Sequence, residues 1–411
     1  MDQPVRDLPA AHWPAGLTRV PYWVYSDPAI ARAEQKRLFE GPAWHFLCLE
    51  VDLPEPGSYR TTMIGAMPVV VVRRENGAIA AFENRCAHRG ALICLEDRGT
   101  ATDFQCVYHA WRYDLCGNLT SIAFRRGING QGGMPADFDM AAHNPRKIRV
   151  TTLCGLVFGT LAADTPPIED DIGPQVLARV QRVLHKPVEV IGRFTQRLPC
   201  NWKLYMENVR DTYHASLLHT FFTTFRITRL SHGGGVMVSD NGVAHASTTL
   251  GPPEGADDSY AGMRADNDEL RLLDPSFMRS VAEFNDPIRI QILSIFPGFV
   301  LQQIHNALAV RQIVPRGVDS MDLNWTYLGF ADDPPELRSM RLKQANLVGA
   351  AGYVSMEDGA VGGFVQRGSA AAEQEASVVE MGGADAASAE TRATEASVRG
   401  FWKAWRAQMA I

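Results

Sequence analysis

Two short Cys–His pairs constrain this chain more than any other feature of its sequence. Cys86 and His88 are separated by one residue, and Cys106 and His109 are separated by two. Two thiolates and two imidazoles in this order suit an iron–sulfur cluster in which one iron binds both sulfurs and the other binds both ring nitrogens. Structural zinc is the alternative, but zinc fingers usually place both cysteines on one knuckle and both histidines on one helix. The mixed pairs therefore favour the iron–sulfur cluster.

The residues around these pairs predict a small antiparallel β domain. Short apolar runs follow one another from residue 59 to 83, and Asn76-Gly77 supplies the positive φ angles of a tight hairpin turn between two of them. Further strand-like runs just before residue 160 close the domain. We therefore expect three parts: an N-terminal arm and helix at 1–40 that packs on the last part, the cluster domain at 41–160 and a larger domain at 161–411.

A second group of ligand-type residues lies on a helix that the sequence predicts after residue 201. Asp211, His214 and His219 follow along it, and the acidic pair Glu357-Asp358 lies far downstream. Two imidazoles and a carboxylate, with open positions opposite them, are typical of a non-heme Fe(II) that activates O₂. His214 and His219 are about 140° apart on an ideal helix, so the helix must bend or end between them if both bind one metal. Either acid fits as the third ligand.

Taken alone, two histidines near a helix end are more often hydrogen-bonded core or surface residues than metal ligands. The upstream Cys–His pairs favour the metal interpretation, because a cluster that delivers electrons needs a centre to reduce. The chain has no GxGxxG turn between a strand and a helix, so no nicotinamide or flavin site is visible and electrons must come from a separate reductase.

Strand-like runs between residues 288 and 328 predict an antiparallel sheet in the larger domain. Arg311 alternates with its neighbours and shares a face with apolar residues, where a guanidinium can bind a carboxylate through two hydrogen bonds. Pairing with a surface acid is an equally good interpretation of this arginine. Residues 230–286 are polar and turn-rich, which predicts a lid or a partner surface, and the small-residue composition of 368–393 predicts a flexible stretch.

Composition and charge exclude several classes of partner. The 411 residues are 46% apolar and 21% charged, and the formal charge of −6 leaves no basic face for nucleic acid. No apolar run approaches the ~20 residues of a membrane helix, and the first residues lack the apolar centre of a signal peptide. Seven cysteines, two of them in the pairs, argue against a disulfide framework. We therefore expect a cytoplasmic protein that binds neither nucleic acid nor membranes.

Five stretches give the chain its resemblance to the large (alpha) subunits of Rieske non-heme iron aromatic-ring-hydroxylating oxygenases, and most to the branch that acts on terephthalate. They are CAHRGALI, QCVYHAW, NWKLYMENVRDTYHASLLHTFFTTF, FPGFVLQQIHNALAVRQ and SMEDGAVGGFVQRG. The resemblance covers nearly the whole chain. It implies an α+β fold, with a small antiparallel β Rieske [2Fe-2S] domain and a catalytic domain whose antiparallel sheet is surrounded by helices in a helix-grip-like arrangement.

Carried over by position, the resemblance implies the following sites. The cluster is bound by Cys86, His88, Cys106 and His109, the mononuclear iron by His214, His219 and Asp358, and the substrate carboxylates by Arg311 and Arg392. Asp211 connects His214 to a cluster histidine of a neighbouring subunit. Some relatives have an asparagine four residues before this aspartate, where this chain has Glu207, so Asn208 is left out of the iron site.

The resemblance also implies a reaction and its partners. We expect cis-dihydroxylation of an aromatic carboxylate, terephthalate to its 1,2-cis-dihydrodiol, with O₂ and with electrons from NAD(P)H through a separate reductase. A small β subunit in an α₃β₃ assembly is implied as well. One alternative is a relative that acts on a monocarboxylate such as salicylate, anthranilate or a halobenzoate. Another is an electron-transfer or structural zinc protein, which the second ligand set disfavours.

Overall fold

The computed structural model describes residues 13–14, 16–251 and 269–411. The chain divides into two compact units, Phe39–Thr165 and Pro166–Ile411, the latter together with the described part of Met1–Leu38. Among the described residues, no helix is both long enough and apolar enough to cross a bilayer. Residues 252–268 of the predicted lid or partner surface lie outside the described residues.

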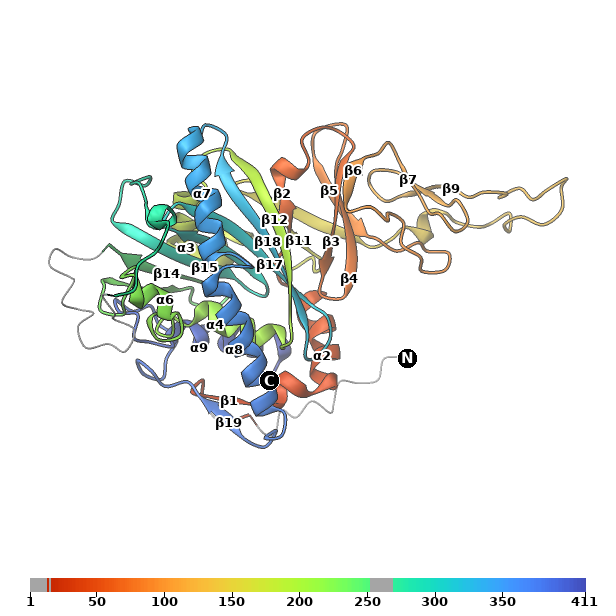
Figure 1. Cartoon of the computed structure of the whole chain (residues 1–411). Coiled ribbons are helices and arrows are strands. Elements are labelled where there is room, and N and C mark those ends of the chain that lie inside the picture. The colour runs from red at the N-terminus through yellow and green to blue at the C-terminus, as the bar shows by residue number, and fades with distance from the viewer. Residues whose placement is uncertain (1–12, 15, 252–268) are drawn as a thin grey trace. The chain divides into compact units, whose positions relative to one another are not determined.

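The smaller unit, coloured orange to yellow in Figure 1, is built on a seven-stranded antiparallel sheet. The strand order is β2-β11-β10-β5-β4-β3-β6. Its strands are β2 His45–Leu49, β3 Ser58–Ile64, β4 Met67–Arg73, β5 Ile79–Glu83, β6 Arg98–Thr100, β10 Lys147–Leu153 and β11 Leu156–Thr160. The β4–β5 hairpin turns at Asn76-Gly77, as the sequence predicts, with Gly77 at a φ of 82°. A positive φ costs glycine little, which explains the residue at this turn.

A second, three-stranded sheet in this unit consists of β7 Phe104–Gln105, β8 Arg112–Tyr113 and β9 Leu119–Ser121. One apolar core joins the two sheets, with Val70 and Phe82 from the larger sheet and Phe104 and Tyr113 from the smaller one. Cys86 and Cys106 belong to the same core. The packing of the two sheets therefore fixes the loops on which both Cys–His pairs lie.

The larger unit is built on another seven-stranded antiparallel sheet, in the order β12-β18-β17-β16-β15-β14-β13. Its strands are β12 Val188–Leu198, β13 Gly234–Val238, β14 Ala244–Leu250, β15 Ile288–Ile295, β16 Phe299–Ile304, β17 Ala307–Pro315 and β18 Met321–Phe330. The antiparallel sheet predicted between residues 288 and 328 is confirmed by β15 to β18.

Helices cover both faces of this sheet (Figure 1). The helices described in this unit are α1 Trp23–Ser26, α2 Pro28–Glu34, α3 Ile168–Val183, α4 Trp202–Arg210, α5 Ala215–Leu218, α6 Thr220–Thr224, α7 Pro335–Val348, α8 Tyr353–Ser369 and α9 Ala396–Met409, of which α3, α4, α7, α8 and α9 contact the sheet. On β15, Gln291 donates to the carbonyl of Arg179 in α3, whereas Ser294 accepts from the guanidinium of Arg210 in α4. Because side chains alternate along a strand, α3 and α4 lie on opposite faces.

The stretch 368–393 is held in place by a strand pair and by hydrogen bonds from Arg399. The flexible stretch predicted from its composition is therefore wrong. Its strand β19, Ala376–Val378, pairs with β1, Arg19–Pro21, near the other end of the chain. Arg399 of α9 is fully buried and donates to the carbonyls of Val379 and Met381, each at 3.1 Å. A single guanidinium has enough donors to hold several backbone carbonyls of a segment that has little regular structure.

Candidate metal centres and the adjoining pocket

The two Cys–His pairs of the smaller unit lie on loops of matching construction. The amide of Cys86 donates to the carbonyl of Ala91 at 2.7 Å, and the amide of Gly90 donates back to the carbonyl of Cys86 at 2.9 Å. The second loop repeats this pattern, since Cys106 donates to Trp111 at 2.9 Å and accepts from Ala110 at 3.0 Å. Each loop is thus a tight knuckle closed by hydrogen bonds around its cysteine.

The side chains on these knuckles fit an iron–sulfur cluster. Cys86 and Cys106 are each 2% exposed, and the rings of His88 and His109 lie with their centroids 4.4 Å apart. The Nδ1 atoms of both histidines are buried and have no hydrogen-bond partner. A buried ring nitrogen without a partner is costly. Two such nitrogens beside two buried thiols match the ligand set of a cluster with one imidazole-bound iron.

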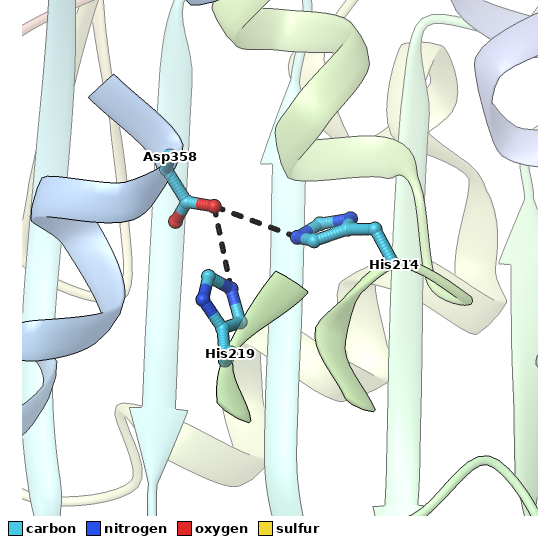
Figure 2. A group of neighbouring side chains, drawn as sticks. All are labelled: His214, His219 and Asp358. Atoms are coloured by element: carbon cyan, nitrogen blue, oxygen red, sulfur yellow. Dashed lines mark ion pairs between the residues drawn. The ribbon is translucent and has the colours of Figure 1, made fainter. Parts of the chain in front are cut away.

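The larger unit brings together His214, His219 and Asp358, as Figure 2 shows. Oδ1 of Asp358 lies 3.5 Å from Nε2 of His214 and 3.3 Å from Nε2 of His219. One ligand atom from each residue lies within 4.8 Å of the others. Two imidazoles and a carboxylate that converge in this way fit a divalent metal ion with open coordination positions.

The chain leaves helical geometry between α4 and the two histidines, which allows both rings to reach one point. α4 ends at Arg210, and Asp211 is extended, with φ −78° and ψ 124°. His214 then precedes the short α5, and His219 separates α5 from α6. The condition that the helix must bend or end is therefore met, although the single helix expected through residue 219 is wrong.

Each histidine of this centre has an acid beside its outer nitrogen. Glu357 accepts a hydrogen bond from Nδ1 of His219 at 2.8 Å, and Oδ2 of Asp211 lies 3.4 Å from Nδ1 of His214. Such acids fix the orientation of a ring so that Nε2 faces the metal. Glu357 and Asp358, which the sequence does not distinguish, thus occupy different positions, because only Asp358 contacts both Nε2 atoms.

Asn208 was left out of this site by sequence reasoning, yet its Nδ2 donates to Oδ1 of Asp358 at 3.0 Å. Its position on α4, six residues before His214, gave no indication that it would face a residue of α8. Burial acts to raise the pKa of Asp358, but hydrogen bonds and charge from His214 and His219 outweigh it and hold the pKa well below its ordinary value. For His214, burial acts to lower the pKa, but hydrogen bonds and charge from Asp211 and Asp358 outweigh it and raise the pKa to about 10. The site therefore favours positive charge.

A pocket adjoins the three residues, and it is lined by both arginines that the resemblance singled out, Arg311 and Arg392. Each is 5% exposed. Arg311 donates to the hydroxyl of Tyr205 at 2.7 Å and lies over the ring of Trp325, 4.8 Å from its centroid. No described carboxylate pairs with Arg311, and its Nε has no hydrogen-bond partner. Pairing with a surface acid is thus not what this structure shows.

Arg392 reaches the same pocket from the segment before α9. Its Nη2 donates to the backbone carbonyls of Arg229 and, at 3.1 Å, of His232. These carbonyls fix the position of the guanidinium. Arg399, the other arginine near the start of α9, binds only carbonyls of the preceding segment and does not line the pocket.

Comparison with known proteins gives consistent matches for both units. Residues 43–129 match the Rieske [2Fe-2S] domain, and residues 184–411 match the catalytic domain of the ring hydroxylating alpha subunit. The chain is 58% identical over 394 residues to alpha subunit 2 of the terminal oxygenase component of terephthalate 1,2-dioxygenase from Comamonas sp., covering 95% of each chain. It is 45% identical over 397 residues to the large subunit of anthranilate 1,2-dioxygenase from Burkholderia cepacia, covering 95% of this chain and 93% of that one.

The fold also matches a solved structure. Naphthalene 1,2-dioxygenase from Rhodococcus sp. bound to indole superposes with a TM-score of 0.79 at 22% sequence identity, and the match covers 95% of this chain and 94% of that one. At this level of identity the likeness concerns the fold, an antiparallel sheet with helices and a separate Rieske domain.

Proposed function

The chain belongs to the alpha subunits of Rieske-type ring-hydroxylating oxygenases, and from this premise we propose that it cis-dihydroxylates terephthalate to the 1,2-cis-dihydrodiol. Its activity is that of an aromatic-ring dioxygenase that acts on an aromatic carboxylate. Its cofactors are a [2Fe-2S] cluster in the Rieske domain and a mononuclear iron in the catalytic domain. The zinc alternative falls with this family membership.

The choice of a dicarboxylate rests on one observation, the presence of two buried arginines in the pocket beside the iron ligands. A guanidinium that lines a pocket can bind a carboxylate through two charge-assisted hydrogen bonds. One arginine would suffice for a monocarboxylate, whereas two match the two carboxylates of one ring. The identity to a terephthalate 1,2-dioxygenase subunit supports the same substrate.

The residues of the chain have separate tasks in this proposal. Cys86, His88, Cys106 and His109 would hold the cluster, and His214, His219 and Asp358 would hold the mononuclear iron. When bound, the two groups supply electrons and the activation of O₂. Arg311 and Arg392 bind the substrate carboxylates through charge-assisted hydrogen bonds and thereby fix the ring beside His214 and His219. The apolar walls of the pocket, such as Ile290 and Ile292, exclude water from the ring.

The same membership supports a proposal for the partners of the enzyme. A terminal oxygenase subunit needs a reductase, and we propose an NAD(P)H-dependent one together with a small β subunit in an α₃β₃ assembly. Within it, Asp211 would connect His214 to a cluster histidine of a neighbouring subunit. We also propose a cytoplasmic location, where NAD(P)H is available and where the five cysteines outside the two Cys–His pairs stay reduced.

Substrate-dependent O₂ uptake tests the proposal. The purified oxygenase with its reductase and NAD(P)H should consume O₂ with terephthalate and release a cis-dihydrodiol. Benzoate, salicylate and anthranilate leave one arginine without an anion, and their kcat/KM should be lower by at least about tenfold. A monocarboxylate that matches or exceeds terephthalate would contradict the dicarboxylate assignment and favour the monocarboxylate alternative.

A further inference from the structure

Gln302 lines the pocket with a side-chain donor that the protein leaves without an acceptor. It belongs to the central strand β16, is 2% exposed and lines the pocket, and its Nε2 has no hydrogen-bond partner. The next residue, Gln303, faces the other side of the sheet and donates from Nε2 to the carbonyls of Arg289 at 3.1 Å and His305 at 2.8 Å. The fold therefore provides acceptors for Nε2 of Gln303 but none for Nε2 of Gln302, which lines the pocket.

The strand register places Gln302 close to Arg311. Across the β16–β17 pair, Val300 faces Arg311 and Gln302 faces Ala309. Residues that face each other or lie two positions along share one side of a sheet, so Gln302 and Arg311 are diagonal neighbours on the pocket side. Arg311 also has an unused donor, its Nε, in the same pocket.

Two buried donors without acceptors, on neighbouring strands, call for a shared acceptor that enters from outside. We propose that Gln302 and Arg311 form one carboxylate-binding site, in which the substrate carboxylate accepts hydrogen bonds from Nε2 of Gln302 and Nε of Arg311. This inference rests on the proposed function and deepens it, since it assigns a specificity role to Gln302. A site built from buried donors rejects analogues that lack the matching acceptor, because those donors then stay unpaired.

Equilibrium binding of terephthalate to the assembled oxygenase, measured by calorimetry, tests this site. Gln302→Met keeps the length of the side chain and removes the donor. We expect it to raise the Kd of terephthalate and the KM about tenfold, as for one hydrogen bond to a charged group, and to change kcat by less than about twofold. An unchanged Kd in Gln302→Met would overturn the inference.

A double-mutant cycle shows whether the two residues share one carboxylate. In the Arg311→Met background, the further change Gln302→Met should have little additional effect on the Kd, because the carboxylate is no longer held there. If the increases in Kd caused by the two substitutions multiply in the double variant, Gln302 contacts another part of the substrate. That result would overturn the shared site. If Arg311→Met alone leaves the Kd unchanged, the proposed function of the pocket fails as well.

The Tm and a matched control variant test whether Gln302 has only a structural role. Gln302→Met should keep or raise the Tm, because it removes a buried amide that the protein itself does not satisfy. A lower Tm with an unchanged Kd would show a purely structural role. Gln312→Met makes the same change on the other face of the neighbouring strand, where Gln312 accepts from Asn324, and should leave the Kd unaltered.

Discussion

Glu357 and Asp358 are adjacent in the sequence, but α8 directs them to different nitrogens of the iron ligands. Asp358 faces both Nε2 atoms, whereas Glu357 accepts from Nδ1 of His219 at 2.8 Å. The acid behind a ligating imidazole fixes its tautomer and its direction. The charge and hydrogen bonding around the two rings are therefore set by Asp211, Glu357, Asp358 and the amide of Asn208, and not by the three metal ligands alone.

Removing the acid behind His219 should weaken iron binding. We expect Glu357→Ala to lower iron affinity about 10–100-fold, the usual cost of losing such a partner, and Glu357→Gln to lower it less because its amide oxygen still accepts from Nδ1. Iron content after equilibration with a graded chelator measures the change. Glu336→Ala, a change in the first turn of α7, is the control. Iron retained by Glu357→Ala at the wild-type level would contradict this role.

The corresponding acid behind His214 is expected to affect turnover more than metal content. In the wild-type chain the backbone amide of Tyr213 donates to Oδ1 of Asp211 at 2.9 Å. Asp211→Asn keeps an oxygen that can accept this hydrogen bond, so we expect the backbone turn to be preserved. The neutral amide no longer stabilises positive charge on His214, and we expect steady-state turnover to fall by at least about tenfold. Iron and sulfide content together with O₂ uptake check this. Full turnover by a variant that holds both metals would argue against the proposed bridge.

At the scale of elements, α4 connects the iron site to the two ends of the chain. Asn208 on one side contacts Asp358, while Glu207 accepts hydrogen bonds from Tyr25 and Trp402. One turn earlier, Lys203 pairs with Glu34 of α2 at 2.7 Å, and both side chains are buried. A buried pair of this kind is strongly destabilised when one partner is removed, which makes α4 sensitive to changes far from the pocket.

The charge of Glu207 should make stability depend on pH. Burial raises its pKa from the ordinary 4.5 to about 7. Because the folded-state pKa is the higher one, the contribution of Glu207 to the free energy of unfolding is greatest below pH 4.5, falls as the pH rises to about 7 and is then constant. Glu207→Gln removes this loss, so it should be more stable than wild type at pH 8 by up to about 3 kcal/mol.

Urea unfolding of both proteins at pH 4.5 and pH 8 measures this difference. The advantage of Glu207→Gln should shrink to a few tenths of a kcal/mol at the lower pH, because Glu207 is then protonated in the folded state and about half protonated in the unfolded state. Glu336→Gln, at the exposed start of α7, should follow wild type at both values. An equal advantage at both pH values would show that charge on Glu207 is not the cause.

Turns and strands that depend on neighbouring residues can be predicted well from the sequence. Features that depend on contacts between residues far apart in the sequence cannot. The Asn76-Gly77 turn and the strands from β15 to β18 follow from residues that are close in sequence. The order within 368–393 depends instead on β1 and on buried Arg399, neither of which its composition reveals. Likewise, the periodicity around Glu357 and Asp358 cannot show which acid faces both Nε2 atoms, because the two histidines lie more than a hundred residues earlier.

At the scale of the whole molecule, one chain combines two ligand sets of different chemistry. The Rieske domain presents two buried thiols and two orphaned ring nitrogens, and the catalytic domain presents two histidines and a carboxylate beside a pocket with two buried arginines. We therefore expect both iron centres to serve one reaction on a ring held by its carboxylates.

A single turnover tests this claim most directly. Oxygenase prepared without oxygen, with iron and acid-labile sulfide verified in both centres, is reduced chemically, freed of reductant, and mixed with terephthalate and ¹⁸O₂ in the absence of a reductase. The account predicts a cis-dihydrodiol labelled in both hydroxyl groups, formed as the visible absorption of the reduced cluster returns to that of the oxidised one. No product from fully loaded protein, or product with a single labelled oxygen, would contradict it.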